Sequence, residues 1–403
     1  MKTKTWEINK LEEVCEILDN KRVPISSKNR IRGIYPYYGA SGIVDYIDKY
    51  IFDEELVLIG EDGAKWGAFE NSAFIAEGKY WVNNHAHILK PNNEILINKF
   101  LVYFLNYSNL EKYITGATVK KLNQQKLKQI EIPLPPLEEQ MRIVKILDLA
   151  FEKIDTSVEL LKANLANLDE LAQSVLDRTF NPLGDSADST ESTQNPSTHD
   201  TQSPYPLPQH WEWKTLGEIG DIITGSTPSK NNPKFYGNDY PLFKPSDLGS
   251  GNTIKASDNL SKLGFESARK LPKNTLLVVC IGASIGKIGL SGIIGSCNQQ
   301  INAIIPSPNV LSKYLFFVCH SKYFQSILKK NASQTTLPII NKTEFSKLEI
   351  PLPKDIKEQE QIAMHLDSVF EKAKALKELY TKELKDYEEL KQSLLDKAFK
   401  GEL

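Results

Sequence analysis

The sequence has few cysteines and lacks the paired cysteines that are typical of metal sites. Its four cysteines, Cys15, Cys280, Cys297 and Cys319, are widely spaced, and no two of them form a CxxC pair. Unpaired thiols are usual in reducing compartments. We therefore expect reduced cysteines and a cytoplasmic protein.

Long hydrophobic runs and an excess of charge are also absent. No apolar run approaches the roughly 20 residues that a membrane-spanning helix needs, and the first residues, MKTKTWEINKLEEV, lack the apolar core of a signal peptide. The net charge of −2 over 403 residues is not that of a nonspecific nucleic-acid binder, although it permits local basic patches. These features predict a soluble protein of two or three domains without a membrane partner.

One stretch, Phe151–Phe180, has the heptad pattern of a coiled-coil helix. Its apolar residues alternate three and four positions apart, without an interrupting proline or glycine. Phe370–Phe399 repeats this stretch, from Phe-Glu-Lys at its start to SLLDKAF in place of SVLDRTF at its end. Because no insertion separates these anchors, we expect two paired helices of equal length. Lys377 and Lys391 stand where the first helix has the apolar Val158 and Ala172. The apolar stripe of the second helix is therefore weaker than that of the first.

The repeat continues outside the helices. Trp6–Val14 opens the first half and Trp211–Ile219 the second. The sequence Glu-Ile-Pro-Leu-Pro precedes each helix, at Glu131–Pro135 and Glu349–Pro353, and Glu-Gln follows it in both halves. The prolines prevent either helix from beginning earlier.

Alternating runs of β-branched residues predict strands between these anchors. The predicted strands are Leu56–Ile59, Phe74–Ala76, Leu276–Val279 and Ile301–Ile305, and short helices are expected near Asn98–Asn106 and Leu311–Ser326. The fold class is therefore α+β, with two pseudo-repeated α+β domains joined by two long helices that form a coiled coil. The expected boundaries are 1–135 and 208–353 for the domains, 136–180 and 354–403 for the helices, and 181–207 for a linker.

The linker stands out by composition. Residues 181–210 are rich in Ser, Thr, Pro and Asp and contain no Lys or Arg. Such a composition predicts a flexible tether.

We find no catalytic constellation in the sequence. Gly282–Lys287 is not a phosphate loop, because only three residues separate its glycines and Ile288 replaces the magnesium-binding Ser or Thr. The range Ile281–Gly289, which contains this segment, instead aligns with Ile59–Gly67 of the first half. The alignment predicts a tight strand connection that presents a lysine in each half. A catalytic site, a cofactor and a metal site are not expected.

The Trp-opened halves, the Ile-Pro-Leu-Pro segments with the Glu-Gln that follows, and the long helices occur twice in the same order. This ordered repeat resembles the specificity subunit of type I restriction–modification systems. The resemblance covers essentially the whole chain and includes phrases such as Pro36–Gly42 and Tyr80–His87. It implies two target-recognition domains, each reading one half of a bipartite DNA site, separated by an antiparallel helical pair. It also implies partners: double-stranded DNA, two methyltransferase subunits that dock on the helices, and motor–nuclease subunits. We expect the equal helices to set the spacer between the half-sites.

Polar residues on two aligned segments are the candidate base readers. If both segments are strands, Asn83, His85 and His87 share one face, and Asn298, Gln300 and Asn302 share another. Amides can pair with adenine edges, and histidine can donate to guanine or phosphate. A solvated sheet face is the alternative, but different polar residues in the two halves suit two different half-sites.

Lysines and hydroxyls in nearby loops suit phosphate contacts. The full set of candidate DNA-contacting residues is Lys65, Trp66, Asn83, Asn84, His85, His87, Thr118, Lys120, Lys121, Lys244, Ser246, Lys287, Asn298, Gln299, Gln300, Asn302, Thr335 and Thr336. The alternative function is a non-catalytic coiled-coil adaptor that binds protein partners through its two α+β domains. A basic face that includes Lys65, Lys120 and Lys287 would favour DNA over the adaptor.

Overall fold

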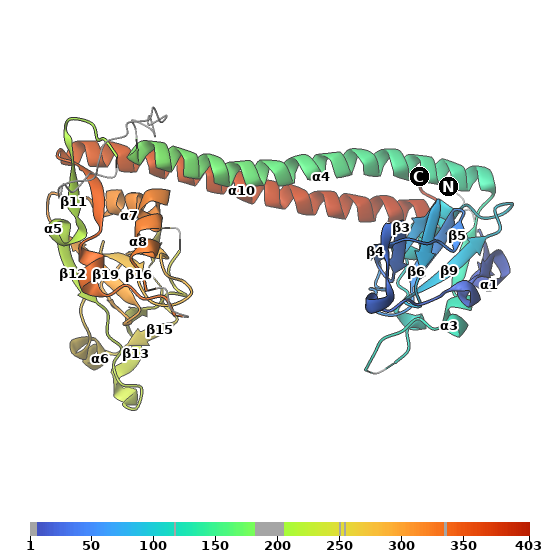
Figure 1. Ribbon diagram of the computed structural model, residues 1–403, viewed down its shortest axis with the longest axis horizontal. Coiled ribbons are helices and arrows are strands. Elements are labelled where there is room, and N and C mark those ends of the chain that lie inside the picture. Colours follow the sequence, from blue (N-terminus) through green and yellow to red (C-terminus); the bar gives the residue numbers. More distant parts are fainter. Residues whose placement is uncertain (1–5, 117, 182–204, 250, 254, 334–336) are drawn as a thin grey trace. The chain divides into compact units, whose positions relative to one another are not determined.

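The computed structural model describes residues 6–403 apart from 117, 182–204, 250, 254 and 334–336 (Figure 1). It divides the chain into two compact units. Unit 1 comprises Met1–Ala163 and Tyr380–Leu403, and unit 2 comprises Asn164–Leu379. Most of the expected linker lies outside the described residues.

Two long helices, α4 (Leu137–Phe180) and α10 (Ile356–Phe399), contribute a segment to each unit. Each has 44 residues, so the predicted equality of length is confirmed. The lysines that interrupt the second stripe form ion pairs with the other helix: Lys391 with Asp155 in unit 1, and Lys377 with Asp169 in unit 2. The later lysine of α10, Lys391, pairs with the earlier aspartate of α4, and the earlier lysine, Lys377, pairs with the later aspartate. The helices therefore run antiparallel (Figure 1).

The repeated ends of each variable part pair as two small antiparallel sheets. Strand β1 (Glu7–Lys10) pairs with β10 (Glu131–Leu134), and β11 (Trp211–Thr215) pairs with β20 (Glu349–Pro353). The sequence had indicated only that prolines delay the helices. The prolines are compatible with these strands because a two-stranded sheet consists of edge strands, where a missing N–H can face away from the partner.

The repeated glutamine at the start of each long helix explains the Glu-Gln motif. The Gln140 side chain is fully buried; its Nε2 donates to the carbonyls of Ile95 and Pro135, and its Oε1 accepts from the N–H of Ile97. Gln359 makes the same three bonds in unit 2, to Asn309, Pro353 and Leu311. One amide therefore joins the start of each long helix to the loop that precedes an earlier helix, α2 (Asn98–Tyr107) in unit 1 and α7 (Ser312–His320) in unit 2.

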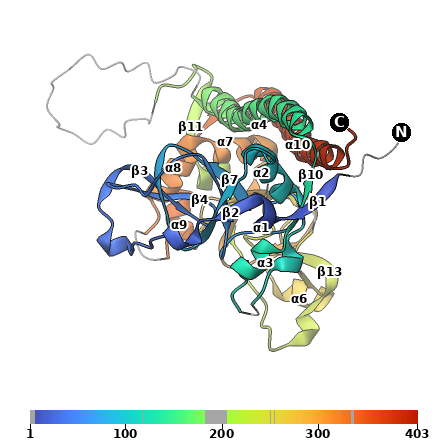
Figure 2. The ribbon, with the colours of Figure 1, turned by 90° about the vertical axis from the view of Figure 1, so that its right-hand side faces the viewer.

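Two four-stranded sheets form the body of unit 1. One has the order β2-β9-β6-β7 and the other β4-β3-β8-β5. Their bounds are β2 Cys15–Ile17, β9 Ala86–Pro91, β6 Leu56–Gly60, β7 Ala73–Ala76, β4 Gly42–Ile47, β3 Arg32–Gly39, β8 Lys79–Val82 and β5 Phe52–Asp53. Helix α2 (Asn98–Tyr107) packs against β6 and β7 (Figure 2). The short helices α1 (Leu11–Val14) and α3 (Gln124–Lys128) complete this unit's core.

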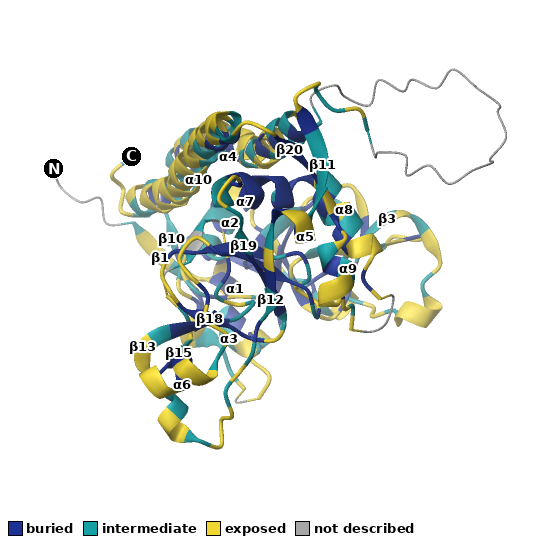
Figure 3. Ribbon diagram, turned by 90° about the vertical axis from the view of Figure 1, so that its left-hand side faces the viewer, coloured by how far each residue is buried: buried dark blue, intermediate teal, exposed yellow. Residues whose placement is uncertain are grey.

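Unit 2 contains a five-stranded sheet, β12-β19-β16-β17-β14, and a three-stranded sheet, β15-β13-β18. Their bounds are β12 Gly220–Thr224, β19 Ile301–Pro306, β16 Leu276–Val279, β17 Ile288–Ser291, β14 Asn252–Thr253, β15 Asp258–Leu260, β13 Tyr236–Phe243 and β18 Ser296–Cys297. The helices are α5 Leu216–Ile219, α6 Lys262–Ser267, α7 Ser312–His320, α8 Lys322–Lys330 and α9 Lys342–Ser346. Helix α7 is largely buried, whereas α6 is largely exposed (Figure 3).

The predicted α+β fold class and its elements are confirmed. The four expected strands correspond to β6, β7, β16 and β19, and the expected helices to α2 and to α7 with α8. No helix of the described residues is long and apolar enough to cross a membrane.

Candidate nucleic-acid interface

Asn83, Asn84 and His85 form a turn between β8 and β9 rather than part of a strand. The Asn83 side chain is buried, and its Oδ1 accepts a hydrogen bond from the His85 backbone N–H at 2.7 Å. Strand alternation does not apply to a turn, so the predicted shared face of Asn83, His85 and His87 is wrong. The turn instead exposes Asn84 and His85, whose side chain is 51% exposed.

The equivalent turn in unit 2, between β18 and β19, is built in the same way. Asn298 is buried, and its Oδ1 accepts from the Gln300 backbone N–H at 3.2 Å. Asparagine favours such turns because its side chain bonds the backbone two residues on. Turn chemistry thus explains the asparagine in both halves, and the predicted shared face with Gln300 and Asn302 is wrong. Gln299 is exposed and Gln300 half-buried.

His87 and Asn302 face the interior at equivalent positions, opposite β6 and β16 respectively. His87 Nδ1 lies 2.6 Å from an Asp19 carboxylate oxygen, and His87 Nε2 lies 2.6 Å from the Leu122 carbonyl oxygen. Both ring nitrogens of His87 thus lie within hydrogen-bonding distance of an oxygen. In unit 2, Thr224 Oγ1 lies 2.7 Å from Asn302 Oδ1. Both side chains are therefore structural, and their predicted contact with DNA is wrong.

A charge network surrounds His87. Arg22 pairs with Glu61 and with Asp19, and Lys121 Nζ lies 2.6 Å from Glu61 Oε1. Burial of Asp19 opposes its ionisation, but the hydrogen bond and charge of His87, the charge of Arg22 and a backbone N–H lower its pKa. Burial likewise opposes ionisation of Glu61, but hydrogen bonds from Lys121 and Arg22 and the charges of His87 and Arg22 lower its pKa.

Asp19, Glu61 and His87 also place potential metal-ligand atoms within 4.8 Å of one another. The cations Arg22 and Lys121 already balance both carboxylates. Desolvated charges of opposite sign that are paired and hydrogen-bonded in this way form a self-sufficient network. We therefore assign the cluster to fastening the loop around Lys121 onto the sheet.

A cleft of about 670 Å³ in unit 1 brings several predicted residues together. Its walls come from the loop after β6 and from the loop that ends at Lys121, and they include Lys65, Thr118 and Lys120, all exposed. Trp66 also lines the cleft, but its ring is 5% exposed and its Nε1 donates to the Gly60 carbonyl at 3.0 Å. Trp66 is thus a core residue, and its predicted contact with DNA is wrong.

The strand registers change the alignment of the two glycine-containing loops. Ile59 lies opposite His87, and Val278 lies opposite Asn302, so Ile59 corresponds to Val278. The sequence had aligned Ile59 with Ile281, three residues further along the chain. Gly63 and Gly282 then become equivalent, and both have a positive φ, of 72° and 97°. Positive φ at a strand end is what glycine tolerates best. The predicted equivalence of Lys65 and Lys287 is therefore wrong.

The remaining candidates in unit 2 are dispersed. Lys287 is half-buried after this loop, and Ser246 is exposed after β13. Lys244 is half-buried, with Nζ 2.5 Å from an Asp258 oxygen, so its charge is already paired. Thr335 and Thr336 lie outside the described residues.

Unit 1 also contains a second basic cleft, which the sequence did not predict. Arg30 and Arg32 line a cavity of about 430 Å³ with Ser27, Asp45 and Tyr46. Arg30 pairs with Asp45 at 3.2 Å and stacks over an aromatic ring. In the sequence, the alternating basic run Lys-Asn-Arg-Ile-Arg at residues 28–32 is the feature that could have predicted this cleft. Such side chains suit phosphate contacts.

A family model described as the type I restriction modification DNA specificity domain matches residues 3–167 and 208–385. A putative type I restriction enzyme specificity subunit of Haemophilus influenzae is 45% identical over 139 residues, which are 34% of this chain and 35% of that protein. The HindI specificity subunit of the same organism is 36% identical over 36% of this chain and 33% of its own length. These two matches thus span about a third of each relative.

Other similarities cover almost the whole chain. The EcoDI specificity subunit of Escherichia coli is 24% identical over 99% of this chain and 88% of its own length. The HsdS subunit from Thermoanaerobacter tengcongensis has a similar fold, with a TM-score of 0.60, 21% identity and coverage of 99% and 98% of the two chains. A chain from a structural study of type I R-M complex assembly has a TM-score of 0.71, 21% identity and 99% coverage of both chains.

Proposed function

Because the chain belongs to the type I restriction modification DNA specificity family, we propose that it selects the DNA site of a type I restriction–modification complex. Each unit reads one half of a bipartite site in double-stranded DNA. The chain itself is non-catalytic: two methyltransferase subunits that dock on α4 and α10 supply methylation, and motor–nuclease subunits supply cleavage.

One observation carries this proposal. The two units use the same asparagine-based turn, yet they carry different polar side chains on it. Unit 1 presents Asn84 and His85, and unit 2 presents Gln299 and Gln300. A shared scaffold with different polar groups is what two different half-sites require, since amides and imidazole form different hydrogen bonds with base edges.

We assign phosphate contacts to exposed cations and hydroxyls around the turn in unit 1. Lys65, Thr118 and Lys120 line one cleft, and Lys121 anchors the loop that forms its wall. Lys287 and Ser246 are the candidates in unit 2, with Thr335 and Thr336 retained from the sequence. Such contacts position a protein on DNA without specifying bases.

The test is to express the chain with its methyltransferase partner and to map methylated sites by long-read sequencing. We expect one bipartite motif. A paired substitution of Asn84 and His85 by alanine should relax one half-site only, and the same change at Gln299 and Gln300 the other half-site. Each lost bidentate contact should cost roughly 1–3 kcal/mol of binding.

The exposed Asn93 provides the control, because Asn93→Ala alters a surface amide of unit 1 outside the turn. It should leave both half-sites unchanged. If no bipartite motif appears, the proposal is contradicted, and a protein-binding adaptor becomes the better explanation. Equal weakening on random DNA in both paired variants would show that the turns do not read bases.

A further inference from the structure

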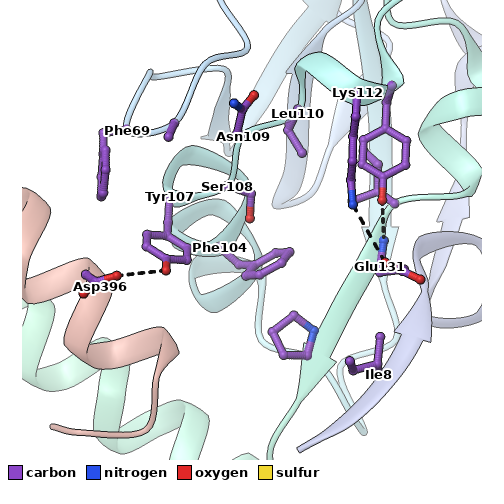
Figure 4. A pocket seen from close by; sticks show the side chains of 14 residues that line it. Ile8, Phe69, Phe104, Tyr107, Ser108, Asn109, Leu110, Lys112, Glu131 and Asp396 are labelled. Carbon is purple, nitrogen blue, oxygen red and sulfur yellow. Dashed lines mark hydrogen bonds and ion pairs between the residues drawn. The ribbon is translucent and has the colours of Figure 1, made fainter.

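A pocket beside β1 in unit 1 is lined by aromatic rings (Figure 4). Its volume is about 580 Å³, and the rings of Phe69, Phe104, Tyr107 and Tyr113 form much of its wall. Ile8, which is 66% exposed, lies at its edge. An open apolar pocket with aromatic walls suits a planar hydrophobic group.

Phe69 is held in this wall by an uncommon backbone conformation. Its φ is 64°, in the left-handed region that bulky residues rarely adopt. Its ring lies edge-on to Tyr107, with centroids 5.6 Å apart. Backbone strain of this kind concentrates at binding sites, where the surrounding structure maintains it for a purpose.

Unit 2 places a tyrosine at the equivalent position. The register of the small sheets makes Ile8 equivalent to Trp213, since Ile8 lies opposite Pro133 and Trp213 lies opposite Pro351. The Tyr205 ring lies edge-on to Trp213, with centroids 4.8 Å apart, and its hydroxyl donates to the Phe180 carbonyl at 2.9 Å. Tyr323 adds a third ring, 5.3 Å from both.

The two sites share their helical wall as well. Asp396 of α10 lines the pocket in unit 1 and accepts a hydrogen bond from the Tyr107 hydroxyl at 3.1 Å. Its equivalent in α4, Asp177, accepts from the Lys322 backbone N–H beside Tyr205. In the part of the chain that the structure describes, the pocket of unit 1 stays open beside this wall.

We propose that this pocket binds an aromatic side chain of the methyltransferase subunit, in the position that Tyr205 takes in unit 2. The identity of the partner rests on the proposed function. The pocket adjoins α10 through Asp396, and α10 is one of the helices to which we assign methyltransferase docking. An aromatic side chain of the partner completes in unit 1 the ring cluster that unit 2 forms from its own chain.

The first experiment probes the pocket without any partner. We expect p-cresol, the tyrosine side-chain analogue, to bind the full-length chain saturably in ligand-observed NMR. Ile8→Trp places in unit 1 the ring beside which Tyr205 packs in unit 2, so it should raise p-cresol affinity by up to about tenfold. Phe69→Gly removes one wall and relieves the positive φ, so it should reduce binding while the protein stays folded.

The control is Ile34→Trp, which adds the same ring at a residue of β3 that is 79% exposed and does not line the pocket. It should leave p-cresol binding unchanged. No saturable binding, or an affinity that neither Ile8→Trp nor Phe69→Gly changes, would overturn the proposal.

The second experiment measures assembly with the methyltransferase subunit by size-exclusion chromatography and titration. Phe69→Gly, which removes a wall of the pocket, should weaken assembly by about tenfold or more, and Ile34→Trp should not. If Phe69→Gly abolishes p-cresol binding but leaves assembly unchanged, the methyltransferase does not occupy the pocket, and the proposal is overturned. A wild-type chain that fails to assemble would contradict the proposed function itself, which distinguishes the two failures.

Discussion

Single buried side chains at equivalent positions differ in charge between the two units. The pair Asp19–His87 in unit 1 corresponds to Thr224–Asn302 in unit 2. The first pair includes the Asp19 carboxylate and belongs to a network with Arg22 and Glu61. The second pair is neutral. The same place in the fold therefore responds to pH in one unit but not in the other.

The lowered pKa values of Asp19 and Glu61 predict acid sensitivity of unit 1. A carboxyl group whose pKa falls on folding stabilises the protein above its unfolded pKa of about 4, and this contribution is lost as the pH falls through the lowered value. Asp19→Asn should therefore cost roughly 2 kcal/mol at pH 7, and the difference from wild type should shrink toward pH 3. Denaturant unfolding across this pH range measures it.

Thr224→Val provides the matched control in unit 2. It removes a neutral hydrogen bond, so its cost should stay constant between pH 7 and pH 4. If Asp19→Asn shows the same flat profile, the network does not contribute through its charge.

At the scale of elements, the starts of the two long helices show how the sequence repeat becomes structure. Gln140 and Gln359 each bond two carbonyls and one N–H, and in each set the proline carbonyl, of Pro135 or Pro353, is part of a buried hydrogen bond. Unpaired buried polar groups are costly, so one side chain holds three segments in place. This explains why the same dipeptide begins both helices.

Replacing either glutamine by alanine should destabilise its own unit. Gln140→Ala removes three hydrogen bonds, one of them the buried bond to the Pro135 carbonyl, and we expect a loss of roughly 3 kcal/mol in the free energy of unfolding. Gln359→Ala should have a similar effect. Gln392, exposed on α10, is the control, and Gln392→Ala should change stability by less than about 0.5 kcal/mol. Similar effects at all three positions would contradict the assigned role.

At the scale of the whole molecule, the relevant property is the equal length of α4 and α10. Each is a continuous helix of 44 residues with a segment in each unit. Ion pairs from Lys377 and Lys391 join the helices at seam positions. Polar groups at such positions specify register at some cost in stability. We therefore propose that this helix pair sets the spacing between half-sites.

Inserting one heptad into both helices, after Leu165 and after Leu384, tests this role. Seven residues restore the seam pattern and lengthen each helix by roughly 10 Å, or about three base pairs. Three base pairs also turn the duplex by about a third of a revolution. The original site should be lost, and any recovered binding should need a longer spacer between unchanged half-sites.

A binding series on duplexes whose spacer varies one base pair at a time provides the measurement. A four-residue insertion at the same points is the control, because it breaks the heptad pattern and should disrupt pairing rather than shift the preferred spacer. If the lengthened protein still prefers the original spacer at unchanged affinity, another contact sets the distance.

The sequence by itself determined the repeat, the fold class and the two long helices. Heptad spacing, flanking prolines and the absence of glycine act over neighbouring residues, so their consequences can be predicted without knowing the tertiary contacts. The strands Leu276–Val279 and Ile301–Pro306 were predictable for the same reason.

Only the tertiary structure decided which polar side chains face solvent. Asn83 and Asn298 turn inward because each bonds its own backbone in a turn, which strand periodicity cannot anticipate. His87 is buried because Asp19 and Leu122, distant in sequence, supply acceptors for both ring nitrogens. Local patterns carry no information on such long-range pairings. The sequence therefore located the candidate interface near these turns, while the choice of exposed residues depended on how distant strands and loops meet.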